Sequence, residues 1–185
     1  MCVIQACNQR GTNTTTENTD SISSADSLNA IKDTSPKLNV PADKNDAQFV
    51  VEAAKGCMAE AAMGKLALHQ AQNKRVKNFG AMMIKDIARA EKRIAVLAKG
   101  RHITLPVVPD TIKQKTIDSL SRKTGKDFDN AYVDNVIKEH NRYLNMFENT
   151  SKTSNDPEIK SFANRALRIL KNHMEAIHTI HDSMK

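Results

Sequence analysis

One stretch constrains the fold of this chain more than any other. It runs from Phe49 to Ala71, and at about 100° per residue it places small and apolar side chains on one stripe of a helix. The members of this stripe are Phe49, Ala53, Gly56, Gly64, Ala67 and Ala71. Glu60 falls in the middle of it, where a carboxylate is costly unless a partner binds it. The stretch therefore predicts an interior helix that other helices approach closely and that needs a polar partner for Glu60.

The other periodic segments also predict helices. Apolar side chains recur at helical spacing, and no segment alternates as a strand does. The expected helices cover residues 46–72, 75–99, 126–149 and 157–183, with a short helix over 111–123. Asp156-Pro157-Glu158 is typical of a helix start, and Gly100 is typical of a helix end. Because the first and last links are short, the sequence predicts two antiparallel hairpins joined by a long crossover.

Composition supports this interpretation. Only 4% of the residues are aromatic and none is Trp, so the core must be built from aliphatic side chains, Ala and Met. We therefore expect one all-α domain over residues 43–185. Residues 1–46 hold four basic and six acidic side chains, a net charge of −2. Because the whole chain has a net charge of +7, the remainder carries +9. Such a surface indicates either ordinary solvated helix faces or an anionic partner. No nucleic-acid-binding module is recognisable, and no nucleic-acid partner is expected.

The N-terminal segment differs from the rest. Sixteen of the 32 residues from Asn8 to Asn39 are Ser, Thr or Asn, so residues 8–42 are expected to form a disordered tether. Ile4-Gln5-Ala6-Cys7 is similar to the end of a bacterial lipoprotein signal, although only six residues precede Cys7. We interpret residues 1–7 as the remnant of a truncated signal. Lipid on Cys7 would then hold the protein to a membrane on the periplasmic side, as in an outer-membrane lipoprotein. If Met1 is the true start, a cytoplasmic location is expected.

Motifs along residues 46–181 match one bacterial family. They include Ala59-Glu60, Gly64-Lys65-Leu66-Ala67, Val76-Lys77, Leu105-Pro106, Phe128-Asp129, Ala131-Tyr132-Val133 and Asp156-Pro157-Glu158. On these residues the chain resembles ferritin-like four-helix bundles known as a domain of unknown function, in predicted outer-membrane or periplasmic proteins. The resemblance implies a ferritin-like bundle with a short extra helix in its crossover, and it implies no activity. The family usually has Asp-His where this chain has Asp86-Ile87, so one inward polar position is missing.

Polar residues interrupt the apolar stripes of three expected helices. They are Glu60, His140 and His173, and Asp86 lies at the edge of a fourth stripe. Two imidazoles with one or two carboxylates would suit a single zinc, iron or copper ion. However, the two histidines are offset by seven residues about their turn, which is about 10 Å along the helix axis. This offset predicts that they lie too far apart for one metal. In the alternative, Glu60 pairs with His140, and His173 forms its hydrogen bond elsewhere.

Three classes of function fit these observations. The first is a non-enzymatic bundle of the cell envelope, with a stress-related role as one form of it, because no complete catalytic set is present and no cofactor is expected. The second is a metal-binding bundle that uses Glu60, His140 and His173. The third is a basic bundle that binds nucleic acid, for which the only support is the charge.

Overall fold

Five helices and the turns between them make up residues 41–185, the part of the chain that this computed structural model describes. They are α1 (Lys44–Gln70), α2 (Lys74–Gly100), α3 (Thr111–Ser121), α4 (Gly125–Thr153) and α5 (Pro157–Asp182). Within this range no residue is in a strand, so the predicted all-α bundle with a short helix in its crossover is confirmed. The expectations for Cys7 and for the tether fall on residues that the structure does not describe.

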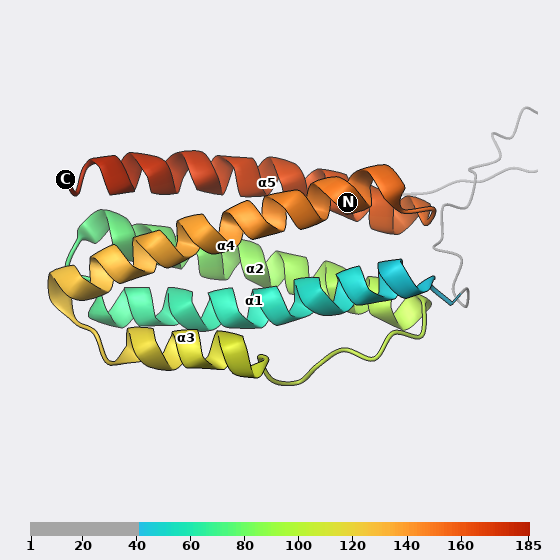
Figure 1. The fold of residues 1–185 in the computed structure, drawn as a ribbon, viewed down its shortest axis with the longest axis horizontal. Helices are drawn as coiled ribbons and strands as arrows, with labels where there is room; N and C mark the ends of the chain where they lie inside the picture. Colours follow the sequence, from blue (N-terminus) through green and yellow to red (C-terminus); the bar gives the residue numbers. More distant parts are fainter. Residues whose placement is uncertain (1–40) are drawn as a thin grey trace, which may run out of the picture. The chain divides into compact units, whose positions relative to one another are not determined.

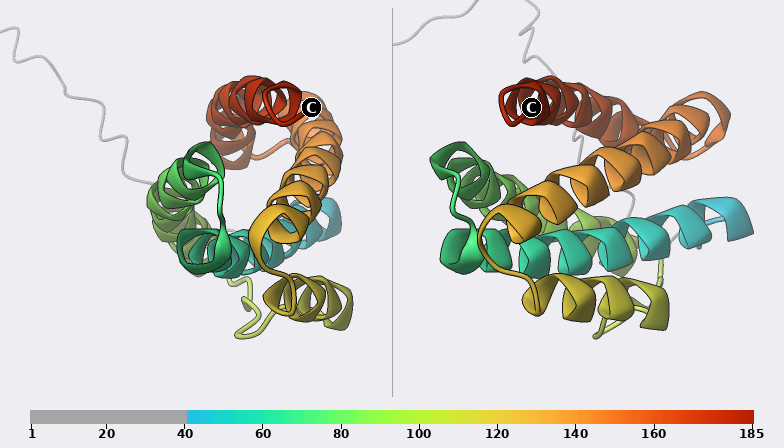
Figure 2. Two further views of the ribbon diagram at one scale, coloured as in Figure 1. Left: turned by 90° about the vertical axis from the view of Figure 1, so that its left-hand side faces the viewer. Right: turned by 60° about the vertical axis from the view of Figure 1, so that its left-hand side comes forward.

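The four long helices form two antiparallel hairpins, α1–α2 and α4–α5, that pack against each other (Figure 1). Seen along the bundle, these helices surround a common interior, and α3 lies outside it against α1 and α4 (Figure 2). Aromatic pairs fill the two ends of the interior. Phe49 meets Phe147 edge-on at 4.9 Å between ring centroids, and Phe128 stacks on Tyr132 at 5.7 Å. No helix within residues 41–185 combines the length and apolarity that crossing a bilayer requires.

The predicted close approach of helices occurs where α1 crosses α2. A Cβ atom added at Gly80 would lie 2.9 Å from the carbonyl oxygen of Gly64 and 2.7 Å from the Cβ of Ala67. A Cβ atom at Gly64 would lie 3.1 Å from the carbonyl oxygen of Gly80. The two backbones therefore touch at this crossing, and any larger residue would push the helices of this hairpin apart.

The sequence interpretation ended the fourth long helix too early. That helix was expected to end at Asn149, but α4 continues to Thr153. The four added residues are Thr150, Ser151, Lys152 and Thr153, which are more typical of a loop. Each hydroxyl donates to a carbonyl three or four residues earlier, and Lys152 pairs with Glu148. These local bonds offset the poor helix propensity of the segment and lengthen α4 by one turn.

Buried side chains also fix the helix ends. Asp129 on α4 accepts hydrogen bonds from the backbone N–H groups of Gln72 and Asn73, in the turn between α1 and α2.

At the other end of α2, Gly100 is the last helical residue, and His102 adopts the left-handed conformation with φ of 55°. The position of Gly100 in the sequence had indicated that this glycine ends α2. The positive φ that follows α2 belongs to His102 instead.

Candidate functional site

Each of the four long helices contributes one polar side chain to a line of contacts through the interior. In order of contact they are Glu60 on α1, His140 on α4, His173 on α5 and Asp86 on α2. We call these four residues the relay. Glu60 Oε1 lies 3.2 Å from His140 Nδ1. His140 Nε2 lies 3.4 Å from His173 Nδ1, and His173 Nε2 lies 3.1 Å from Asp86 Oδ2. The relay therefore links all four helices of the bundle.

The contact between the two histidines corrects the sequence interpretation. The seven-residue offset predicted a separation of about 10 Å, but their ring nitrogens are 3.4 Å apart. The prediction was wrong because it ended α4 four residues early and so misplaced the turn. Measured from the centre of the actual turn at Asn155, the offset is only three residues, or about 4.5 Å along the axis. Glu60 lies against His140, as the alternative to a metal site predicted, but His173 contacts His140 rather than forming its hydrogen bonds only elsewhere.

Burial determines the protonation of the relay. The side chain of Glu60 is 10% exposed, and that of His140 is fully buried. Loss of hydration raises the pKa of Glu60 to about 8 and lowers the pKa of His140 to about 4. Burial also lowers the pKa of His173, although the hydrogen bond with Asp86 acts in the other direction. At pH 7, Glu60 therefore carries its proton and both imidazoles are neutral.

These charges set the direction of the hydrogen bonds. Because the Asp86 carboxylate only accepts, the Nε2–H of His173 donates to it, and Nδ1 of the same ring accepts. The Nε2–H of His140 then donates to that nitrogen. His140 Nδ1 is left as an acceptor facing the protonated Glu60, but neither Nδ1 nor Glu60 Oε1 has an aligned hydrogen-bond partner. Of the three contacts in the relay, the one between Glu60 on α1 and His140 on α4 is therefore the weakest.

We expect the stability of the bundle to be greatest near pH 6.5. Above this value the unfolded chain has lost the Glu60 proton that the folded chain keeps up to a pKa of about 8, so stability falls as pH rises. The slope is about 1.4 kcal/mol per pH unit. Below pH 6.5 the unfolded chain binds protons on both histidines, whereas the pKa of His140 in the folded chain is about 4. Burial lowers the pKa of His173 as well, so two histidines oppose the single effect of Glu60 below pH 6.5.

Urea unfolding of the full chain at pH 5.5, 6.5, 7.5 and 8.5 measures this pH dependence. The Glu60→Gln variant should lose the decline above pH 6.5, whereas Glu91→Gln on the exposed face of α2 should keep it. An equal decline in both variants would show that another group titrates.

The relay does not converge on a point. Within residues 41–185, no group of three or more His, Cys, Asp or Glu side chains is arranged to hold a metal ion. The reason is geometric, since each imidazole directs one nitrogen at the previous member of the line and the other nitrogen at the next. Glu60 Oε1 and His140 Nδ1 have a spacing that suits two ligands of one ion. Two ligands of a tetrahedral ion with bonds of about 2.0 Å lie about 3.3 Å apart, and these two atoms are 3.2 Å apart.

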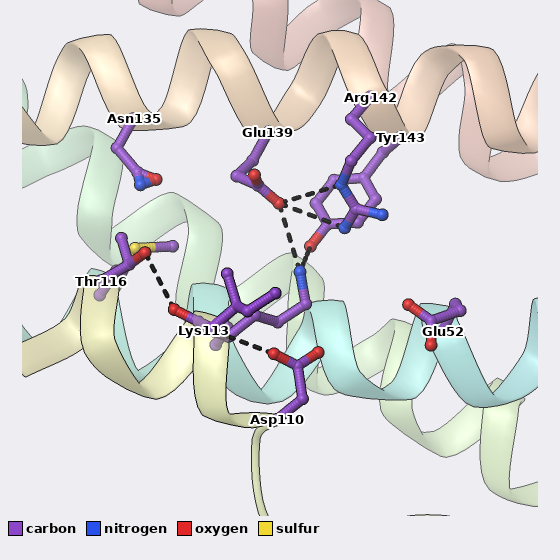
Figure 3. A pocket seen from close by; sticks show the side chains of 11 residues that line it. Glu52, Asp110, Lys113, Thr116, Asn135, Glu139, Arg142 and Tyr143 are labelled. Atoms are coloured by element: carbon purple, nitrogen blue, oxygen red, sulfur yellow. Dashed lines mark hydrogen bonds and ion pairs between the residues drawn. The ribbon is translucent and has the colours of Figure 1, made fainter.

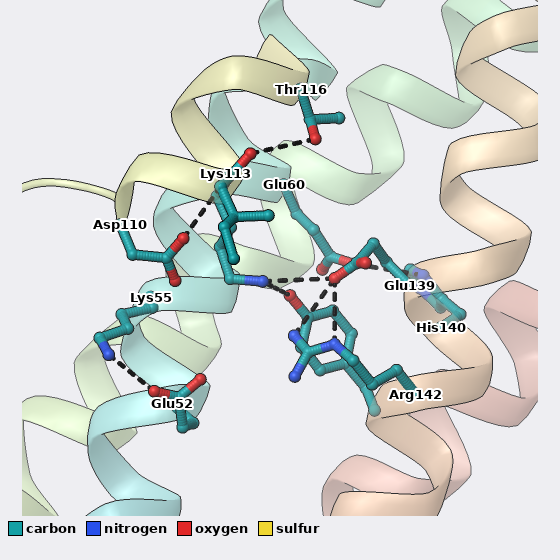
Figure 4. A network of polar contacts seen from close by, with 11 residues as sticks. Glu52, Lys55, Glu60, Asp110, Lys113, Thr116, Glu139, His140 and Arg142 are labelled. Carbon is teal, nitrogen blue, oxygen red and sulfur yellow. Dashed lines mark hydrogen bonds and ion pairs between the residues drawn. The ribbon is translucent and has the colours of Figure 1, made fainter.

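A polar network covers the relay on the side of α3 (Figure 3). Lys113 Nζ lies 3.3 Å from Glu139 Oε2 and 3.2 Å from the hydroxyl oxygen of Tyr143. Arg142 also binds Glu139 and lies over the Tyr143 ring, 4.5 Å from its centroid. Figure 4 shows this network beside Glu60 and His140. Sequence reasoning missed this network, although Glu139, Arg142 and Tyr143 are neighbours at helical spacing on α4.

A cavity of about 510 Å³ lies on the opposite side of the relay, between α1, α2 and α5, and α4 contributes Tyr143 and Phe147 to its lining. Most of its lining is apolar. The lining includes Cys57, Glu60, Asp86, Arg89, Ala90, Arg93, Phe147, Phe162, Arg165, Ala166, Ile169 and His173. Sequence analysis missed this cavity, although its signal was present as small residues on facing helices. Gly56 admits the Tyr143 ring, whose hydroxyl would lie 2.7 Å from an added Cβ.

Comparison with known sequences gives the family. The model for a domain of unknown function, DUF4142, matches residues 32–180. The chain belongs to the DUF4142 family. This assignment agrees with the resemblance seen in the sequence, because both lead to a domain of unknown function. Among curated proteins, none matches this DUF4142 chain significantly.

Two solved structures share the fold. A DUF305 fragment from Deinococcus radiodurans aligns with a TM-score of 0.67 and 12% identity, over 76% of this DUF4142 chain and 97% of the fragment. CopM in its Cu(I)-bound form aligns with a TM-score of 0.63 and 16% identity, over 75% of this chain and 96% of CopM. At such identities the likeness establishes a helical bundle and nothing finer.

Proposed function

We propose that this protein is a non-enzymatic binding protein of the cell envelope, and that its binding site is the cavity between α1, α2 and α5. The observation that carries the proposal is the cavity itself, which is mainly apolar and ends at polar groups of the relay. Its volume lies within the roughly 300–1,000 Å³ of typical small-molecule sites, which combine an apolar lining with a few polar groups. A well-packed bundle of this size has no structural need for such a space.

The lining of the cavity favours binding over catalysis. No Ser or Thr of the described residues lines it, and its only thiol is that of Cys57. Burial and the nearby Glu60 raise the pKa of this thiol, so it is a poor source of the reactive thiolate. His173 already uses both ring nitrogens within the relay. These features leave no nucleophile paired with a free base.

Binding of N-phenyl-1-naphthylamine to the full chain tests this function. This uncharged apolar dye becomes fluorescent in apolar sites, and we expect it to bind at one molecule per chain. The Ala90→Phe variant fills the cavity and should abolish the signal. Ala88→Phe, an exposed position on the same helix outside the cavity, should leave the signal unchanged. If Ala90→Phe does not fold, Ala166→Phe replaces it. Equal dye binding by the wild-type protein and a folded cavity-filling variant would overturn the proposal.

The envelope location rests on the N-terminal sequence. Ile4-Gln5-Ala6-Cys7 followed by the Ser-, Thr- and Asn-rich segment supports a lipid anchor on Cys7 and a tether between anchor and bundle. A single acyl chain anchors only weakly, and two or more anchor firmly. Cells that express the gene with its upstream in-frame sequence should incorporate labelled palmitate into this protein. Cys7→Ser should prevent incorporation, whereas Cys2→Ser should not. A stop codon immediately upstream of Met1 would contradict the anchor.

A transition-metal site is the second candidate. Two observations favour it, the 3.2 Å spacing of Glu60 Oε1 and His140 Nδ1 and the Cu(I)-bound form of the CopM neighbour. In this arrangement Glu60 and His140 would bind zinc, iron or copper, and His173 would orient the His140 ring from behind. Metal analysis of protein purified without an affinity tag tests the site. Near-stoichiometric metal lost in Glu60→Ala and His140→Ala, but kept in the exposed control His69→Ala, would support it.

A further inference from the structure

Three arginines stand at the mouth of the cavity. Arg89 and Arg93 come from α2, and Arg165 comes from α5 on the opposite side. All three residues are exposed, and each also lines the cavity. Guanidinium groups bind carboxylates and phosphates in a fork geometry, so three of them around one opening form a site for an anion.

Few acidic groups oppose these arginines. Arg89 Nη1 pairs with Asp86 Oδ1 at 2.9 Å. Among residues 41–185, no carboxylate lies within ion-pair distance of Arg93 or Arg165. Glu60, the other carboxyl group of the lining, keeps its proton at pH 7 because burial raises its pKa to about 8. Three guanidiniums and one carboxylate therefore leave two positive charges at the mouth.

The interior of the cavity is suited to an aliphatic chain. Below the arginines the lining is formed by Phe147, Phe162, Ile94, Met83, Leu170 and the small residues Ala53 and Ala166. Ile169 also lines the cavity and is 47% exposed, so it extends the apolar surface toward solvent. Burial of apolar ligand surface would supply most of the affinity.

We propose that this cavity binds a single-chain anionic amphiphile, an aliphatic carboxylate such as a medium-chain fatty acid. Its hydrocarbon chain lies among the apolar side chains, and its carboxylate meets Arg93 and Arg165 at the mouth. This inference rests on the proposed binding function and adds the chemical class of the ligand. A neutral or cationic chain of equal length would fill the interior but would leave both guanidiniums without an anionic partner.

Competition with the bound dye tests the ligand class. Dodecanoate, dodecan-1-ol and dodecyltrimethylammonium share one chain length and differ in charge. The two ionic compounds are used below their critical micelle concentrations, and dodecan-1-ol is used below its solubility limit. We expect dodecanoate to displace the dye at concentrations at least tenfold lower than either of the others require. Salt should weaken dodecanoate and leave dodecan-1-ol unaffected.

A charge-matched pair of variants tests the role of the arginines. Arg93→Gln with Arg165→Gln should weaken dodecanoate at least tenfold and leave dodecan-1-ol unchanged. Arg75→Gln with Arg168→Gln removes the same charge at exposed positions outside the cavity and should have little effect. Circular dichroism checks that both variants fold.

Each outcome separates the ligand class from the binding function. If the dye binds but dodecanoate and dodecan-1-ol compete equally, the ligand class is wrong and the binding function stands. If the dye does not bind at the cavity, both are wrong. Binding to phosphatidylglycerol vesicles without competition by dodecanoate would replace the proposal with a membrane-surface site.

Discussion

Replacing His140 by leucine is expected to lower the free energy of unfolding by about 2–4 kcal/mol, among the largest effects of any single change in this bundle. The imidazole is fully buried and contacts both Glu60 and His173. Leucine is of similar size, so the loss arises mainly from the two polar groups left without a partner, at about 1–3 kcal/mol each. Urea unfolding at pH 6.5 measures the change.

A double-mutant cycle isolates the contact with Glu60. Glu60→Leu alone leaves His140 Nδ1 facing an apolar side chain, and we expect a cost of about 1–3 kcal/mol. The double variant leaves only His173 without its partner, so it should be less destabilised than His140→Leu alone. His69→Leu, at an exposed position on α1, is the control and should change stability little. Additive single effects would mean that Glu60 and His140 do not interact.

The bundle itself could be predicted from the sequence because each long helix carries its own apolar stripe. Four helices and the short α3 appear close to their expected positions, and Asp156 caps α5 as the run Asp156-Pro157-Glu158 indicated. The one large error, the end of α4, arose where Thr150, Ser151 and Thr153 satisfy carbonyls of their own helix. Local propensity favours a loop for such a run, and side-chain hydrogen bonds reversed that preference.

The site could be predicted only in part. Stripe positions identified Glu60, His140 and His173 as inward-facing, since rotation about one helix depends only on its own sequence. Their contacts depend on how the helices are shifted along their axes, which turn lengths control, and a four-residue error there separated the two histidines. The cavity was harder to predict than these contacts. Its empty space depends on how the side chains of several helices pack together, and the apolar stripe of a single helix does not indicate it.

The sequence indicated only one of the two roles of Asp156. Asp156 was recognised as the cap of α5, and its side chain does accept from the backbone N–H groups of Glu158 and Ile159. It also accepts two hydrogen bonds from Arg101, at 2.6 Å and 2.7 Å. The Arg101 side chain is only 7% exposed and reaches Glu158 as well, at 3.1 Å. The start of α5 is therefore bound to the end of α2 by a buried, bidentate ion pair.

Asp156→Ala should consequently cost about 3–5 kcal/mol, because it leaves the buried guanidinium of Arg101 with Glu158 as its remaining partner and removes the cap. Asp110→Ala is the matched control. Asp110 caps α3 in the same way, through the backbone N–H of Lys113, but binds no arginine, so we expect only about 1 kcal/mol. Asp156→Asn keeps a good cap and loses the charge, and it should fall between the two. Similar costs for Asp156→Ala and Asp110→Ala in urea unfolding would show that the cap alone matters and that the ion pair contributes nothing.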